Sequence, residues 1–342
     1  MTPVTRKLAS IVSILSVEPV PNADRLEKIG SLGYQVVSEK GRWSVGDMAV
    51  YFEADSVLPD IDALRWVWTP KDTPPDVKVP RPADQRLRAV RLRGCLSMGI
   101  LLKLPELGLD PKDFKTGDDV TSLLGVTQFE EDSSDEAFRA PFPSFVSRTS
   151  EMRAQSLPDV LKELAGKAWV ATLKIDGQSL TAYLDAGDLH VTGRKHSILE
   201  SDVPHWRVAR KYKLQDVLRE NPHLVIQGEV AGPGILGNKL ELKEHDFFVY
   251  NIHHKQEDRL FLDAEMREFC ADHGLKAVPK VAEGVEFSKT MDELQELSAG
   301  KYEGTNRNRE GIVVRPRDEL IRSDTVGKWL SFKMINNSSL VK

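Results

Sequence analysis

The chain has 342 residues, which is long for one ordinary core and about right for two domains. Its composition, 40% hydrophobic and 29% charged, is that of a globular protein, and no apolar run approaches the roughly 18 residues that a membrane helix needs. The net charge of −5 gives no global sign of nucleic-acid binding. The N-terminus lacks the apolar stretch of a signal peptide, and Cys95 and Cys270 lie far apart in apolar settings. We therefore expect a protein of the reducing cytoplasm with two buried, unbonded cysteines.

The first 128 residues contain short β-rich runs separated by turn residues. The predicted strands are Ala9–Leu15, Tyr34–Val37, Met48–Phe52 and Leu87–Leu92, each bounded by Gly, Pro, Asn or Asp. Short strands, frequent turns and no long helical period favour a small β-barrel over residues 1–128.

One segment of this region is strongly basic: Lys78–Arg93 holds six basic residues and a single acid. Its arginines at 86 and 88 would face one side of a strand and those at 91 and 93 the other, unless a bulge near Ala89–Val90 brings them together. Two interpretations stay open for this segment. It forms a nucleic-acid groove, or it is a solvated edge strand that charge protects from aggregation.

Residues 129–143 are predicted to be an interdomain linker, because they are acidic, then proline-containing, and lack periodicity. From residue 144 to 342 the pattern becomes mixed α and β. Helices are expected near Pro204–Lys213, Ala264–Asp272 and Met291–Leu297, the last with a capping box of Thr290 and Glu293. The expected strands are Ala168–Leu173, Ser179–Leu184, Leu224–Val230, Asp246–Ile252 and Ile312–Val314.

The motif that carries chemistry is Lys174-Ile175-Asp176-Gly177, at the end of an expected strand and beside a turn that glycine makes possible. Alone, four such residues recur by chance. Here they are followed in order by Thr192-Gly193-Arg194, Gln227-Gly228-Glu229, Phe247-Phe248-Val249-Tyr250, Glu310-Gly311-Ile312-Val313-Val314 and Ser331-Phe332-Lys333.

These six ordered elements resemble those of the covalent nucleotidyltransferase superfamily, which contains ATP-dependent DNA ligases, RNA ligases and mRNA capping enzymes. The resemblance covers roughly residues 144–342. It implies that Lys174 is the nucleophile that takes AMP from ATP, with Mg²⁺ or Mn²⁺ as the metal. The other roles that it implies are Arg194 at the ribose and phosphates, Glu229 at the ribose hydroxyls or metal waters, Phe248 (or Phe247) against adenine, Asp176 and Glu310 in the metal-water shell, Gly177 beside the nucleotide, and Lys333 at the α-phosphate.

The chemistry of these residues is consistent with those roles. A lysine must attack as a neutral amine, yet its usual pKa is about 10.4. Lowering this pKa toward neutrality takes about 3 units, or roughly 4 kcal/mol, from nearby cations or from burial. We expect metal-bound ATP and neighbouring basic residues to supply it. Phosphoryl transfer otherwise needs positioning and charge neutralisation.

Three details of the motifs need comment. Many superfamily members end with two lysines two residues apart, but Ser331 stands where the first would be, so either Lys328 compensates or Lys333 acts alone. The segment Gly232–Gly237 matches the dinucleotide-binding pattern G-x-G-x-x-G, but no helix is expected after it, which excludes that function. The eight histidines show no spacing typical of metal ligands.

The order of the domains suggests the subfamily. Only nine residues follow Lys333, which leaves no room for the C-terminal OB barrel of DNA ligases and capping enzymes. The N-terminal region instead resembles an OB fold, and the whole arrangement resembles RNA ligase family 5, the nick-sealing ligases known from Deinococcus. The segment Ser147–Gln155 is similar to theirs, which implies that Arg153 lies near the nucleotide and that Arg148 and Gln155 contact the RNA.

The expected fold is therefore α+β, an N-terminal OB-like β-barrel followed by a ligase-type nucleotidyltransferase domain with antiparallel sheets and flanking helices. The expected function is ATP-dependent sealing of a 3′-OH to a 5′-phosphate in a nicked duplex of RNA or RNA and DNA, with RNA at the 3′-OH end, by a monomer. The 2′-OH and the A-form shape distinguish such an end from DNA. Phosphate contacts from Arg207, Arg210, Lys211 and Lys213 are weighed against plain surface charge.

Two alternatives remain open on the sequence alone. A DNA-joining ligase would use the same chemistry on a deoxyribose end. An RNA-binding protein with an inactive nucleotidyltransferase domain finds its one support in Ser331, whereas the intact Lys174, Glu229 and Glu310 argue against it.

Overall fold

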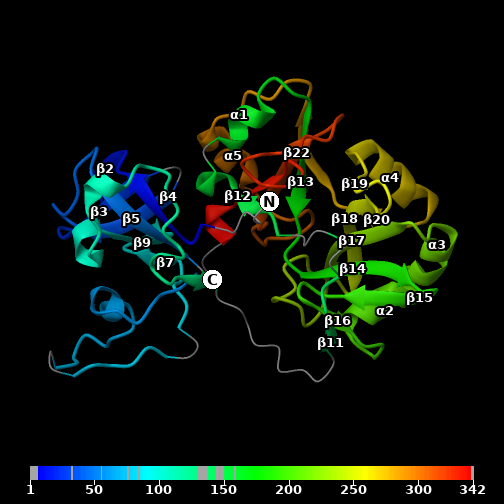
Figure 1. The fold of residues 1–342 in the computed structure, drawn as a ribbon, viewed down its shortest axis with the longest axis horizontal. Coiled ribbons are helices and arrows are strands. Elements are labelled where there is room, and N and C mark those ends of the chain that lie inside the picture. The colour runs from blue at the N-terminus through cyan, green and yellow to red at the C-terminus, as the bar shows by residue number, and fades with distance from the viewer. Residues whose placement is uncertain are drawn as a thin grey trace. The chain divides into compact units, whose positions relative to one another are not determined.

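The structure is a computed structural model, and it describes residues 7–31, 34–54, 56–74, 77–82, 85–128, 138–143, 146, 150–157 and 159–339. Contacts within the chain divide it into two units, one up to residue 132 and the other from 133 to 340 (Figure 1). Over the described residues, every helix is too short or too polar to span a bilayer.

The first unit is built from short antiparallel strands, as the turn-rich sequence predicts. One sheet contains β1 (Ala9–Ser13), β5 (Met48–Glu53) and β9 (Gly99–Leu102), and a second contains β2 (Ser16–Pro19), β3 (Leu26–Ser31) and β4 (Tyr34–Glu39). Two short pairs join β6 (Ser56–Val57) to β10 (Thr127–Gln128) and β7 (Val90–Leu92) to β8 (Cys95–Ser97). Alternate apolar residues of β1 and β5, such as Ile11 and Phe52, fill the core of this unit.

The expected strand Leu87–Leu92 is wrong in its first half. Only Val90–Leu92 is extended and paired, and the residues before it are irregular. A two-residue turn at Arg93 and Gly94, with φ of 50° and 84°, closes the hairpin with β8. Because the strand starts at Val90, Arg86 and Arg88 lie outside it, and the bulge considered near Ala89–Val90 is not needed to align the arginines. All three residues of β7 are exposed.

The predicted linker is also corrected in part. Residues 129–137 lie outside the described residues, but β11 (Phe138–Pro141) is a strand of the second unit that pairs with β16 (His196–Ile198). Proline cannot donate a backbone hydrogen bond, which is tolerated at the edge of a sheet where β11 lies.

The second unit contains two sheets. The large sheet has the order β11, β16, β15 (Asp188–Thr192), β14 (Gln178–Asp185), β17 (Leu224–Ala231), β18 (Asp246–His254), β19 (Arg259–Leu260), with β20 (Lys276–Ala277) also on β18. The small sheet has the order β12 (Met152–Arg153), β23 (Phe332–Ile335), β22 (Gly311–Pro316), β13 (Trp169–Lys174), β21 (Lys280–Gly284).

Helices cover one face of each sheet, so that each sheet has its own core (Figure 1). The large sheet packs against α2 (Pro204–Lys211), α3 (Leu214–Glu220) and α4 (Asp263–Asp272), and the small sheet against α1 (Val160–Leu164) and α5 (Met291–Ser298). The opposite face of the small sheet carries Thr172, Lys174 and Lys333.

The three predicted helices are confirmed as α2, α4 and α5. In the predicted capping box of α5, the Thr290 hydroxyl accepts from the Glu293 amide at 3.2 Å and the Glu293 carboxylate accepts from the Thr290 amide at 2.7 Å. Helix α3 was not predicted. It follows α2 after Lys213, whose left-handed φ of 48° turns the chain. Of the two free cysteines, Cys270 is buried as expected, whereas Cys95 is only half-buried.

Candidate functional site

The turn Lys174–Gly177 connects the two sheets of the second unit, because β13 belongs to the small sheet and β14 to the large one (Figure 1). Lys174 is paired in register with Gly311 of β22, which brings Glu310 beside it. The Lys174 Nζ lies 2.7 Å from Glu310 Oε2, and the two side chains are only 24% and 23% exposed. The Lys174 amine therefore lies beside Glu310, which the sequence interpretation assigns to the same site, and it does not extend into water.

Gly177 allows the turn to lie directly on β17. A Cβ atom at this position would be 2.3 Å from the Val230 carbonyl oxygen and 2.9 Å from Glu229 Cγ. The glycine is thus required for close approach between the turn and β17, rather than for a left-handed backbone conformation. This contact sets Glu229 directly under the turn.

Strand register places two further predicted residues on the face of the small sheet that carries Lys174. Thr172 is opposite Val313, Val313 is opposite Lys333, and Lys333 is opposite Arg153. Residues opposite one another share a face, and Thr172 shares its face with Lys174 two positions along β13. Lys333 and Arg153 therefore lie on the same face as Lys174, whereas Ile312, Val314 and Phe332 fill the core behind it.

The two phenylalanines of β18 lie on opposite faces of the large sheet. Phe247 is fully buried in the core of the large sheet, while Phe248 is partly buried and packs near Ile175, on the side of the turn. Phe248 is also paired in register with Glu229. Tyr250 packs in the same cluster, although the sequence interpretation gave it no role. It sits at a β-bulge, where β18 has one more residue than β17, and no local pattern predicts such a bulge.

The three carboxylates around Lys174 dominate the electrostatics of the site. Burial raises the pKa of Glu229 to about 8, with Glu310 and Asp176 adding to the shift and Lys174 and Arg194 opposing it. For Lys174, burial disfavours the charged form, but the charges of Glu310, Glu229 and Asp176 outweigh burial and raise the pKa of the amine.

The sequence interpretation expected metal-bound ATP and neighbouring basic residues to lower this pKa. The neighbours that the fold supplies are carboxylates, so in the protein alone Lys174 is held as a cation. The physical reason is the number of carboxylates within reach, which cannot be counted before the fold is known. An attack by Lys174 therefore requires these carboxylates to be neutralised by something other than the lysine.

Asp176 is paired with a residue that the sequence interpretation missed. The Lys239 Nζ lies 2.5 Å from Asp176 Oδ2, with the side chains 31% and 14% exposed. Lys239 comes from the loop after Gly232–Gly237, which is followed by turns and no helix, as predicted. Its only signal in the sequence was its place directly after Asn238 in that glycine-rich segment.

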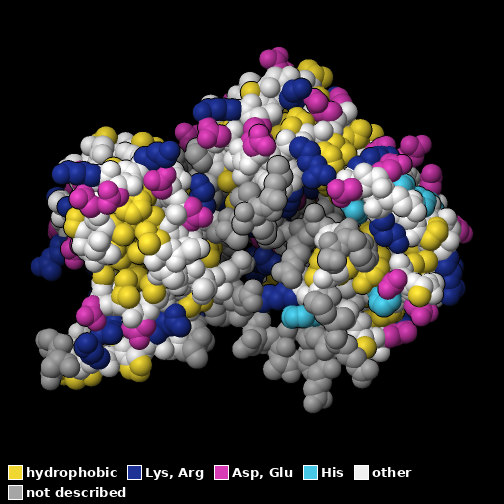
Figure 2. All heavy atoms as spheres, in the orientation of Figure 1, with side chains coloured by type: hydrophobic (Ala, Val, Ile, Leu, Met, Phe, Trp, Pro, Cys, Tyr) yellow, Lys and Arg dark blue, Asp and Glu magenta, His cyan; other side chains and the backbone are white. Residues whose placement is uncertain are grey.

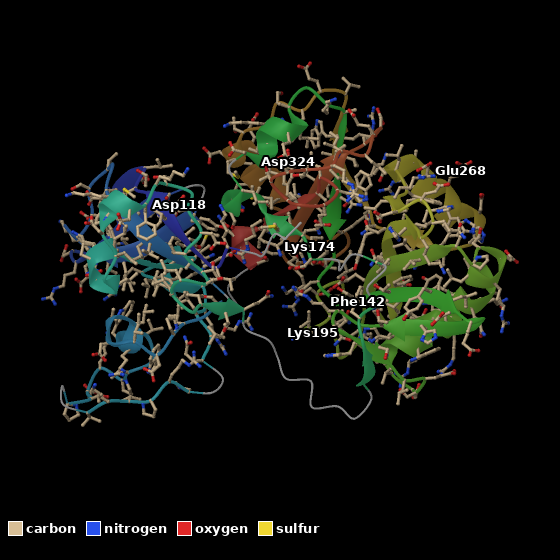
Figure 3. The ribbon with its side chains drawn as sticks, in the orientation of Figure 1. Asp118, Phe142, Lys174, Lys195, Glu268 and Asp324 are labelled. Atoms are coloured by element: carbon tan, nitrogen blue, oxygen red, sulfur yellow. The ribbon has the colours of Figure 1, made fainter. Side chains whose placement is uncertain are left out.

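Arg194 lies at the tip of the hairpin between β15 and β16, where the Gly193 amide donates to the His196 carbonyl at 2.9 Å. Its guanidinium is exposed and donates to the Ser150 hydroxyl at 3.0 Å. Figure 3 labels Lys195 from this hairpin, and Lys174 above it in the view. Ser150 therefore contacts the hairpin, and three residues later Arg153 is paired with Lys333.

The two residues expected to contact RNA have different outcomes. Arg148 lies outside the described residues. Gln155 is 1% exposed, and its amide nitrogen lies 3.3 Å from Gln295 Oε1 and 2.9 Å from Met334 Sδ. This environment is a packed interior, so that contact with RNA remains only a prediction for Gln155.

Lys328 does not stand free in place of the absent lysine at 331. Its Nζ lies 3.5 Å from Glu151 Oε2 and donates to the Ser150 carbonyl at 3.2 Å. Burial disfavours the Glu151 carboxylate, but Lys328 and Arg315 outweigh burial and lower its pKa. Lys328 therefore neutralises the buried carboxylate of Glu151.

The basic residues of α2 are likewise paired with acids. Arg207 makes two hydrogen bonds of 2.7 Å with Asp202, and Arg210 bonds Glu200 at 3.1 Å. Lys211 bonds Glu244 at 3.0 Å. These contacts favour plain surface charge over the phosphate contacts weighed from the sequence. Figure 2 shows basic and acidic side chains interspersed over the visible surface.

Over the described ranges, no group of three or more His, Cys, Asp or Glu side chains is arranged to hold a metal ion. The water-mediated shell of Asp176, Glu229 and Glu310 remains a prediction.

Comparison with known proteins identifies both parts of the chain. The model of a family described as RNA ligase matches residues 167–334, and one described as an OB-fold domain matches residues 8–104. The second match agrees with the small β-barrel expected at the N-terminus. None of the curated proteins compared is similar enough to count as a match.

Solved structures of Naegleria gruberi RNA ligase are similar over nearly the whole chain, at 30% identity. An apo mutant has a TM-score of 0.81 and covers 98% of this chain and 97% of its own. The form with pyrophosphate has a TM-score of 0.80, and a mutant with ATP and Mn has 0.81, each covering 98% of both chains.

Proposed function

The chain belongs to the RNA ligase family, and on that premise we propose that it uses ATP to seal a 3′-OH to a 5′-phosphate through an adenylylated Lys174. The observation that carries this proposal is the position of one amine. The Lys174 Nζ lies 2.7 Å from Glu310, in a site that also contains Glu229 and shares its face with Lys333.

The proposed reaction has three steps. The Lys174 Nζ attacks the α-phosphorus of ATP, which forms a P–N bond and releases pyrophosphate. An oxygen of the RNA 5′-phosphate then attacks the same phosphorus, so that AMP leaves the lysine and the RNA end becomes a phosphoanhydride. Finally the 3′-oxygen attacks the 5′-phosphate, which forms the phosphodiester and releases AMP.

The site residues fit a divalent cation. Asp176, Glu229 and Glu310 bring three carboxylates together, and the ammonium groups of Lys174 and Lys239 stand against two of them. The raised pKa of Glu229, caused by burial and then by the charges of Glu310 and Asp176, indicates that negative charge is crowded in the site. Hard oxygen donors of this kind suit Mg²⁺ or Mn²⁺.

Mg²⁺ or Mn²⁺, held by Asp176, Glu229 and Glu310 through water, would supply charge neutralisation to the phosphates and would remove the carboxylate field that keeps Lys174 protonated. The remaining contribution comes from the chain itself. Burial of Lys174 would then favour the neutral amine, and Lys333 and Arg153, side by side on one sheet face, are placed to hold the phosphates.

Phe248 is the aromatic side chain that we assign to adenine, because it is partly buried beside the turn and paired with Glu229. Glu229 would then face the ribose, and Arg194 would approach it from the hairpin tip.

The finer assignment is to the nick-sealing ligases of family 5, which read RNA at the 3′-OH end of a duplex nick. The N-terminal unit supports it, since the strands of residues 8–104 match an OB-fold domain, a fold that commonly binds nucleic acids. Within this unit we propose the exposed β7 hairpin, with Arg91 and Arg93, as the phosphate contact.

Labelling tests the first step. The purified protein, incubated with α-labelled ATP and Mg²⁺, is expected to become covalently labelled, and Lys174→Ala is expected not to. Lys162→Ala, which removes an exposed lysine of α1, is the matched control and should be labelled like the wild type. Labelling of Lys174→Ala would contradict the assigned nucleophile.

Nicked duplexes that differ only in the sugar at the 3′-OH test the substrate. Sealing is expected with ribose at that position and to be much weaker with deoxyribose. Equal sealing of both would favour a DNA-joining ligase. Binding of the RNA duplex with no adenylate on protein or RNA would favour an inactive, RNA-binding protein.

A further inference from the structure

Tyr302 makes three hydrogen bonds to the site through one atom. The residue lies in the turn before β22, is 3% exposed, and packs against Ile175 and Val278. Its hydroxyl donates to the Lys174 carbonyl at 3.1 Å. It accepts from the Asp176 amide at 3.1 Å and from the Glu310 amide at 3.2 Å.

These bonds use the full capacity of a phenol, which is one donor and two acceptor positions. Two of them hold the backbone on either side of Ile175, and the third holds the start of β22. Lys174 and Glu310 are 136 positions apart in the chain, so that a single hydroxyl fixes the spacing between the nucleophile and its partner carboxylate.

The turn that carries Tyr302 is itself firmly held. The Tyr302 amide donates to the Arg307 carbonyl at 3.0 Å, and the Thr305 hydroxyl donates to the Tyr302 carbonyl at 3.1 Å. The Arg309 guanidinium donates to the Ser298 carbonyl at 3.1 Å, at the end of α5. The hydroxyl is thus anchored to a helix, not to a loose loop.

We propose that Tyr302 is a positioning residue for adenylyl transfer, which acts by fixing Lys174 relative to Glu310. This inference rests on the proposed ligase function. A nucleophile must stay close to its attack geometry, and a displacement of about 1 Å can cost about 100-fold in rate. Tyr302 touches no reacting atom, so its loss should slow the step without weakening ATP binding.

The test is Tyr302→Phe, which keeps the ring and its packing and removes only the hydroxyl. Single-turnover labelling with α-labelled ATP should show a maximal rate roughly 10- to 100-fold below wild type, with the ATP concentration for half-maximal rate changed less than about 2-fold. Tyr212→Phe is the control, because it removes a hydroxyl that bonds Asp246 and none of the backbone atoms at Lys174, Asp176 or Glu310. Its labelling rate should stay within about 2-fold of wild type.

Each outcome decides between the two proposals. Labelling of Tyr302→Phe at the wild-type rate, or a change confined to the ATP concentration, overturns the positioning role and leaves the ligase function standing. Absence of label on the wild type overturns the ligase function, and the positioning role with it. If Tyr302→Phe does not fold, Thr305→Val loosens the turn and leaves the hydroxyl in place, and a rate equal to wild type in that variant overturns the inference.

Discussion

Glu229→Gln tests whether the site holds this carboxyl group protonated in the metal-free protein. Burial, supported by Glu310 and Asp176, raises the pKa of Glu229 from 4.5 to about 8. Between these values the folded chain keeps a proton that the unfolded chain releases, so the free energy of unfolding falls as the pH rises. The slope is about 1.4 kcal/mol per pH unit, which gives a ceiling of about 4 kcal/mol between pH 5 and 8. Water in the partly open site screens part of this, and we expect about 2 kcal/mol.

The assay is urea unfolding at pH 5, 6, 7 and 8 without divalent metal, on the wild type, Glu229→Gln and Glu268→Gln. The wild type and Glu268→Gln, whose substituted side chain lies at the periphery on α4 (Figure 3), should lose stability together as the pH rises. Glu229→Gln should lose about 2 kcal/mol less over the same range, because glutamine does not titrate. Parallel curves for all three proteins would refute the argument that burial, Glu310 and Asp176 hold the Glu229 carboxyl group protonated.

Single contacts lead to three further predictions. Lys239→Met removes the ammonium group that lies 2.5 Å from Asp176 and would compete with a metal ion for this carboxylate. The Mn²⁺ concentration for half-maximal labelling should therefore fall about 2- to 5-fold. A rise would contradict this competition. Arg91→Ala with Arg93→Ala should reduce the salt dependence of binding to a nicked duplex by about 1 in slope for each phosphate that the hairpin neutralises, while an unchanged slope by fluorescence anisotropy would exclude the hairpin. Burial lowers the pKa of His205 from 6.5 to about 4, so the wild type should lose up to about 3 kcal/mol of unfolding free energy as the pH falls from 7 to 4. His205→Gln should lose less in the same urea titrations, and an equal loss would refute this assignment.

The strands and helices that the sequence predicted well are those with a strong local pattern. β13 and β17 have apolar, β-rich cores, and α5 begins with a complete capping box. Helix α3 was missed because only Tyr212 and the left-handed Lys213 separate it from α2. A periodic pattern in the sequence does not reveal so short a break. The strand β11 was missed because its partner β16 lies almost 60 residues further along the chain.

The candidate site divides along the same line. The order of the motifs can be read along the chain, and its resemblance to the nucleotidyltransferase superfamily implies a common site for Lys174, Glu229, Glu310 and Lys333. The charge state of Lys174 in the protein alone depends on how many carboxylates the fold gathers around it, where the sequence interpretation expected basic neighbours. Tyr302 has no motif, and its role follows only from three backbone contacts that meet at one oxygen.

The register of the small sheet also explains how this chain can lack a lysine at position 331. Arg315 is one step past the paired residues Val314 and Phe332, in the row of Ser331, and it donates to Asn251 Oδ1 at 2.8 Å. Glu151 adds a buried carboxylate at this row, which Lys328 neutralises from the loop before β23. A lysine at 331 would add a third positive charge, although Lys328 and Arg315 already balance the one carboxylate of Glu151. The row nearer Lys174 carries Lys333 beside Arg153, and it is to that pair that we assign the proposed phosphate contact.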